Sequence, residues 1–249
     1  MSTATQKIVD RALVVHTVPS TLAFSPIGRY VSPALAGVGK RGHVALTFDD
    51  GPDPVSTPEF LRVLDELGWH ATFFMLGDMV RAAPGLAAEV AAAGHEVGVH
   101  ADVHRSQKRM SPRAIRDDVA RAYDAVSEAS GVRPVWYRPP HGALSLEGKR
   151  AARKVGMKAV LWTTWGRDWR AEATPASIIA DLAAGRLAGG TLLLHDYAAS
   201  GSWRATVAAL PRLAELLDRR HLAAGPLGEH GLPAGRRNAR RPPGGRPPR

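Results

Sequence analysis

Cysteine is absent from the 249 residues of this chain. Without cysteine there is no disulfide framework, no thiolate nucleophile and no cysteine-ligated metal site. Any bound metal must therefore be held by histidine and carboxylate side chains. The absence of cysteine does not decide the cellular compartment.

Long hydrophobic runs are also missing. No segment approaches the roughly 20 consecutive apolar residues of a membrane-spanning helix, so no transmembrane segment is expected. The short apolar run at residues 12–15 is flanked by Asp10, Arg11 and His16, and the basic start of a secretory signal is absent. These observations predict a cytoplasmic protein, with export without a recognisable signal as the alternative.

Acidic residues are missing from the C-terminal end of the chain. Residues 235–249 contain six arginines and no acid, whereas the rest of the chain holds 27 basic and 23 acidic residues. A segment of arginine, proline and glycine cannot bury a core, so we expect it to be disordered. It could make weak contact with an anionic polymer or a membrane surface. It lacks aromatic residues that stack on bases, so no obligate nucleic-acid partner is expected.

From residue 43 onward, short apolar runs alternate with helical patterns. The expected strands are 44–48, 71–75, 96–99, 135–137, 158–162 and 191–194, and the expected helices are 57–68, 84–93, 112–131, 145–155, 174–185 and 203–219. Buried strands separated by helices favour a parallel sheet. The pattern predicts a single α/β domain, a distorted (β/α) barrel of about seven parallel strands. We place this domain at 43–223, after an N-terminal extension (1–42) and before a linker and disordered tail (224–249).

Ionisable residues lie at or just beyond the ends of the expected strands. In β/α barrels, the loops at the carboxyl ends of the strands build the active site. We therefore expect one site to contain Asp49, Asp50, His100, Arg138, Asp168 and His195.

Asp49 and Asp50 are adjacent carboxylates that precede a Gly-Pro turn. Two carboxylates side by side cannot both ionise cheaply. Such a pair is kept where a cation neutralises it or where one of the carboxylates transfers a proton. The alternative is a pair of solvated turn residues, because Asp-Gly and Gly-Pro are ordinary turn formers.

His100 and His104 are four residues apart. On a helical turn this spacing places both imidazoles on one face, near enough to share a metal. Two histidines and one carboxylate suit a divalent ion of the zinc type, with open positions for water and substrate. The alternative is two unrelated surface histidines.

Three further residues have side chains suited to catalysis. Arg138 precedes two prolines that stiffen the backbone, and its guanidinium could hold a carboxylate through two hydrogen bonds. His195 ends a buried strand, and histidine is the side chain best suited to exchange protons near neutral pH. Asp168 offers a carboxylate beside the aromatic Trp169. Each could instead be an ordinary loop or core-edge residue.

Together these stretches resemble the polysaccharide deacetylases of carbohydrate esterase family 4, which share the NodB homology domain. The resemblance covers roughly residues 43–220. Five family motifs occur in order, at Thr47–Pro52, His100–His104, Arg138–Gly142, Asp168-Trp169 and Leu193–His195. It implies a distorted barrel that binds a divalent metal, usually zinc, with cobalt as an alternative.

The resemblance also implies a role for each motif residue. It makes Asp50, His100 and His104 the metal ligands. It makes Asp49 the general base and His195 the general acid, with Arg138 orienting the base and Asp168 tuning the acid. It also implies four substrate-binding residues. Trp169 and Leu193 form the walls of an acetyl pocket, Pro139 lies beside the substrate, and His141 contributes its backbone N–H.

Three positions depart from the family pattern. Ala101 stands where Ser or Thr usually follows the first histidine, so we expect a looser metal-binding loop. Trp165 occupies a position that often carries an additional Asp. His141 stands where Tyr is frequent, although the family uses only the backbone N–H there.

The predicted function is metal-dependent removal of N-acetyl groups from amino-sugar oligo- or polysaccharides, with release of acetate. The alternatives are hydrolysis of another amide, a cyclic imide or an O-acetyl ester on the same fold, or a non-catalytic sugar-binding relative. Because every catalytic position is filled, a working site is favoured over a binding protein. The sequence does not indicate which carbohydrate is the substrate.

Overall fold

Strand β1 (His43–Asp49) is buried at every residue. The computed structural model of the chain describes residues 24–232. On one side β1 pairs in parallel with β2 (Thr72–Leu76), and on the other with β7 (Thr191–His195). The sheet runs in the order β5-β4-β3-β2-β1-β7-β6. The remaining strands of this path are β3 (Glu96–Ala101), β4 (Trp136–Tyr137), β5 (Lys158–Ala159) and β6 (Thr164–Trp165).

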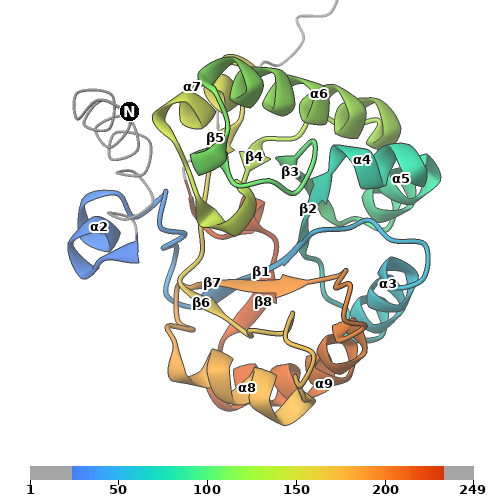
Figure 1. Cartoon of the computed structure of the whole chain (residues 1–249). Helices are drawn as coiled ribbons and strands as arrows, with labels where there is room; N and C mark the ends of the chain where they lie inside the picture. The colour runs from blue at the N-terminus through green and yellow to red at the C-terminus, as the bar shows by residue number, and fades with distance from the viewer. Residues whose placement is uncertain (1–23, 233–249) are drawn as a thin grey trace, which may run out of the picture.

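The sheet is curled, and helices surround it (Figure 1). Seven parallel strands in one domain confirm the predicted distorted (β/α) barrel, with β5 and β6 at the two ends of the path. The helices after β1 are α3 (Thr57–Glu66), α4 (Gly77–Ala82), α5 (Pro84–Ala92), α6 (Pro112–Ser130), α7 (Leu146–Lys154), α8 (Pro175–Ala184) and α9 (Trp203–Arg219). Among the described residues, no helix is both long and apolar enough to cross a membrane.

Several helices begin where the sequence predicts, because their caps are local. Ser111, Ser145 and Thr174 each accept a hydrogen bond from a backbone N–H in the first turn of the following helix, at 2.9–3.2 Å. Such caps satisfy N–H groups that have no partner within the helix. Helix α3 begins at Thr57, directly after Ser56.

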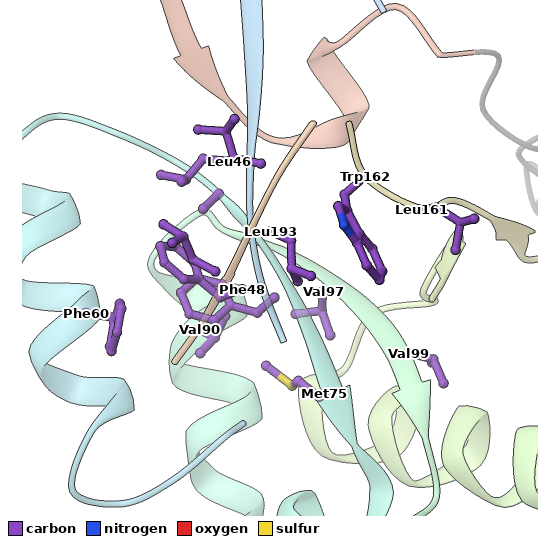
Figure 2. Packing of buried hydrophobic residues seen from close by; sticks show 14 of the residues in the cluster. Leu46, Phe48, Phe60, Met75, Val90, Val97, Val99, Leu161, Trp162 and Leu193 are labelled. Carbon is purple, nitrogen blue, oxygen red and sulfur yellow. The ribbon is translucent and has the colours of Figure 1, made fainter. Parts of the chain in front are cut away.

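The core lies between the strands and the helices. Its aromatic centre is Phe48, whose ring centroid lies 5.0 Å from that of Phe60 on α3 and 5.1 Å from that of Phe73 on β2. Figure 2 shows Phe48 among side chains from several elements, including Leu46, Met75 and Val97. This packing supports β1, the strand that ends in Asp49.

The predicted strand at 158–162 is wrong in its extent. Only its first two residues form a strand, β5, because the backbone at Leu161 bonds outside the sheet, and the separate strand β6 follows beyond the predicted range. The Leu161 N–H donates to Leu35 O at 2.8 Å, and its carbonyl accepts from Arg138 Nη2 at 3.2 Å. Asp168 therefore follows β6 rather than β5.

The segments on both sides of the predicted domain contain structure. Residues before β1 include α2 (Pro26–Val31), which lies at the periphery in Figure 1, and the buried Leu35. The linker predicted from residue 224 is wrong for its described part. There, β8 (Ala223–Gly225) pairs with β1, and Leu227 is buried. The predicted tail lies outside the described residues.

Candidate active site

The turn after β1 is held by a buried carboxylate, Asp196. Its Oδ1 accepts from Gly51 N at 3.1 Å, and its Oδ2 accepts from Thr57 Oγ1 at 2.7 Å. A Cβ at Gly51 would lie 2.0 Å from Asp196 Oδ2, so only glycine fits. At Asp50 the backbone φ is 80°. Burial raises the pKa of Asp196 to about 7. The sequence did not identify Asp196, whose partners lie far away along the chain.

Asp49 is neutralised by Arg138. The last residue of β1 is 2% exposed, and its Oδ1 lies 2.7 Å from Arg138 Nη1. The arginine is fully buried, also donates to Thr47 Oγ1 at 2.7 Å, and stacks on Phe74 with its Cζ 4.1 Å from the ring centroid. A buried carboxylate needs such a partner, because an unpaired buried charge is costly.

Asp50, His100 and His104 form a set with metal-binding geometry. Asp50 Oδ1 lies 3.3 Å from His100 Nε2 and 3.4 Å from His104 Nε2. One ligand atom from each residue lies within 4.8 Å of the others. Asp50 Oδ1 is buried yet has no hydrogen-bond partner among the described residues. Two imidazole nitrogens and an unsatisfied carboxylate oxygen fit a divalent cation of the zinc type.

The protonation state of His104 also suits a metal ligand. Burial lowers the pKa of His104 to about 4, so its imidazole is neutral near pH 7. A neutral imidazole is the form that coordinates a metal.

Residues His100–His104 do not form the helical turn that their spacing suggested. His100 lies in β3, which ends at Ala101, and a bend follows at residues 102–104. The bend turns the chain back so that both rings stack, with centroids 5.4 Å apart. Spacing of four residues alone does not separate a helix from a strand end followed by a bend.

Asp102 anchors this metal-binding loop from its middle. This buried carboxylate contacts Arg81 Nη1 of α4 at 2.8 Å and Arg121 Nε of α6 at 2.9 Å. Its own N–H donates to Asp118 Oδ2 at 3.2 Å. Although Ala101 lacks a hydroxyl, the ionic contacts of Asp102 therefore anchor the loop. The sequence did not reveal this anchor, because the two arginines lie on other elements.

We expect Asp102→Asn to weaken metal binding by about tenfold, because partners that orient metal ligands typically contribute 10–100-fold to affinity. Asparagine retains the shape of the side chain but loses the charge that holds both arginines. Competition with a chelator of known affinity measures the effect. Asp117→Asn, on the exposed face of α6, is the matched control. Equal affinities in the two variants would show that Asp102 does not support the loop.

His195 is held by Asp168. The carboxylate accepts from His195 Nδ1 at 2.9 Å and from the His195 backbone N–H at 2.8 Å. Thr206 Oγ1 on α9 donates to Asp168 Oδ2 at 3.0 Å. Burial lowers the pKa of His195, but the charge and hydrogen bond of Asp168 outweigh it and raise the pKa to about 9. Thr206 was not found from the sequence.

These groups face one cavity with a volume of about 410 Å³. Across it, His195 Nε2 lies 4.0 Å from Asp50 Oδ2, which places the histidine opposite the metal-binding set. The wall contains the predicted residues Trp169, Leu193 and His141, together with Trp162 and Trp165. Arg138 and Asp168 are buried and do not line the cavity, and neither does Pro139, which was expected on the substrate side and is also buried.

Comparisons with known proteins agree with this geometry. A family model described as polysaccharide deacetylase matches residues 36–160. The chain is 36% identical to a chitooligosaccharide deacetylase from Bradyrhizobium sp. (strain ANU 289), over 74% of this chain and 88% of the relative. It is 35% identical to a peptidoglycan-N-acetylglucosamine deacetylase from Bacillus cereus (strain ATCC 14579), over 68% of this chain and 79% of the relative. A solved acetyl xylan esterase of family 4 from Clostridium thermocellum, in complex with a cobalt ion, superposes with a TM-score of 0.68 at 29% identity, covering 75% of this chain and 88% of that one.

Proposed function

This chain belongs to the polysaccharide deacetylase family, and on that premise we propose that it hydrolyses N-acetyl groups of amino-sugar oligo- or polysaccharides and releases acetate. One observation carries the proposal. A carboxylate held by arginine and a histidine held by a second carboxylate face one cavity, with the metal-binding set beside them.

We assign the metal to Asp50, His100 and His104, whose donor atoms fit zinc. When bound, such an ion lowers the pKa of a coordinated water and polarises a carbonyl. Cobalt is the alternative, supported by the cobalt ion in the solved esterase.

Asp49 is the proposed general base. Arg138 holds its Oδ1, and the residue lines the cavity beside the metal-binding set. Asp49 takes a proton from the attacking water as the water oxygen bonds to the acetyl carbon. The guanidinium orients the carboxylate for this transfer.

His195 is the proposed general acid. Its Nδ1 is engaged by Asp168, which leaves Nε2 to face the cavity. As the carbon–nitrogen bond breaks, Nε2 gives its proton to the leaving amine, and acetate departs. The negative charge that develops on the acetyl oxygen requires a donor, and we assign the backbone N–H near His141 to that role.

The substrate is tested by incubating the zinc-reconstituted protein with chitotetraose and, separately, with the disaccharide of peptidoglycan. Mass spectrometry should show the loss of acetyl groups, and an amine assay should show one free amine for each acetyl group lost. If neither sugar loses acetyl groups while a simple amide or an O-acetyl ester is hydrolysed, the assignment to N-acetyl sugars is wrong.

The rate should fall at alkaline pH as His195 loses its proton. Asp168 raises the pKa of His195, so the protonated acid persists above the ordinary histidine range and is lost as the pH rises through the raised pKa. In the metal-loaded protein the fall should begin below pH 9, because a divalent cation beside Asp50 disfavours a second positive charge.

Asp168→Asn should therefore move the alkaline limb of the kcat profile to lower pH by about one unit or more. Asp218→Asn, at an exposed position on α9, should leave the profile unchanged. An alkaline limb at the same pH in Asp168→Asn and the wild type would contradict the assignment of His195 as the acid.

A further inference from the structure

A second cavity adjoins the candidate active site. Its volume is about 570 Å³, and it shares His141, Trp162 and Trp165 with the cavity described above. The remaining wall includes Phe24 and Arg29 from the region of α2, and Arg167 and Asp181 from the other side. We propose that this second cavity binds a neighbouring sugar unit of the substrate, one that carries a carboxylate. The inference rests on the proposed function.

The shared wall offers an aromatic platform. Trp165 is 37% exposed, although tryptophan is usually well buried. Its ring stacks with Trp162, with centroids 6.1 Å apart, and packs against Trp169 at 5.3 Å. Both neighbours restrict its motion, so little conformational entropy is lost when a ligand packs on it. A rigid, exposed aromatic surface between two cavities suits the apolar face of a sugar ring.

The charge of the cavity favours an anion. Arg29 makes one hydrogen bond within the described residues, from Nη2 to Thr163 O at 3.2 Å, and no carboxylate there lies within ion-pair distance of it. Arg167 and Asp181 lie 3.9 Å apart and largely compensate each other.

The unneutralised charge in the cavity therefore belongs to Arg29. Its planar guanidinium is suited to a carboxylate, which it can hold through two hydrogen bonds.

Arg29 is placed by local structure that precedes the barrel. Ser25 caps α2 by accepting from Gly28 N at 2.9 Å. The ring of Phe24 lies 5.0 Å from that of Trp162. These contacts fix the start of α2 against the wall of the cavity. The segment expected as a mere extension thus contributes a binding residue.

The test compares two ligands that differ only in charge. One is N-acetylglucosamine linked to N-acetylmuramic acid, and the other is the same disaccharide with its carboxyl group reduced to an alcohol. Binding is measured by calorimetry on metal-free protein, so that neither ligand is hydrolysed. The wild type should bind the acid about tenfold more tightly, because a hydrogen-bonded charge pair typically contributes at least that factor.

Arg29→Gln should remove the preference for the acid and leave binding of the reduced disaccharide unchanged. Arg150→Gln, at an exposed position on α7, should keep the preference. Trp165→Ala should weaken both ligands by about fivefold. Equal affinity of the wild type for the two ligands, or an unchanged preference in Arg29→Gln, would overturn the proposal.

Turnover of neutral chitotetraose separates this proposal from the proposed function. If chitotetraose is deacetylated but the wild type shows no charge preference in binding, only the second cavity is wrongly assigned. If the charge preference is present but neither sugar is deacetylated, the carboxylate site stands and the proposed reaction is wrong.

Discussion

Asp49→Asn should lower kcat by about 10²–10⁴-fold, the range that a positioned general base contributes, and should leave the bound metal in place. Asparagine is nearly isosteric and can still accept a hydrogen bond from Arg138, but it cannot take a proton from water. Asp49 lies beside the metal-binding set rather than in it, with Oδ2 3.8 Å from His100 Nδ1. Activity and metal content are therefore expected to separate.

The measurement combines steady-state kinetics with elemental analysis of the same sample. Asp65→Asn, at an exposed position on α3, controls for removal of a carboxylate elsewhere. Because Asp49 and Arg138 form a buried pair, thermal unfolding must show that the variant is folded. A folded, metal-loaded Asp49→Asn protein with wild-type turnover would show that another group is the base.

His104→Ala should lose metal and turnover together. Removing one of three protein ligands weakens the site, and the electrostatic stabilisation that a metal supplies is worth several kcal/mol, or at least about 10³-fold in rate. His104 is about one-third exposed, so its removal should disturb the core little. Chelator competition measures the affinity, and kinetics at saturating zinc tests for rescue.

His70→Ala is the matched control, since His70 is exposed and lies near His95 rather than the cavity. It should retain both metal and turnover. A His104→Ala protein with unchanged zinc affinity would exclude His104 as a ligand. Full turnover without bound metal would exclude the metal from the reaction.

The features predicted best from the sequence were those that depend on short segments of the chain, such as strand ends and helix caps. Asp49 and His195 stand at the ends of apolar runs that form strands, so their arrival at one edge of a parallel sheet followed from topology. The caps at Ser111, Ser145 and Thr174 depend on the next three residues and were likewise predictable. The sequence grouped Asp50, His100 and His104, and the structure brings them together, although the turn between the two histidines is a strand end and a bend rather than a helical turn.

The interactions that hold these residues were not predictable, because they join distant parts of the chain. Thr206 reaches Asp168 from α9, and Asp196 closes the turn at Gly51 from the end of β7. The anchoring of Asp102 depends on two arginines from α4 and α6. Nothing in the local sequence pattern marks such pairs, since their geometry exists only after the strands and helices have packed.

Metal dependence of acetate release is the decisive measurement for the proposed reaction. The purified protein is stripped with a chelator, then restored with zinc, and acetate and free amine are measured on chitotetraose at each stage. We expect no release after stripping and, after zinc is restored, equal amounts of acetate and amine. Undiminished acetate release from protein shown by elemental analysis to contain no metal, or none from the restored protein, would contradict the proposal.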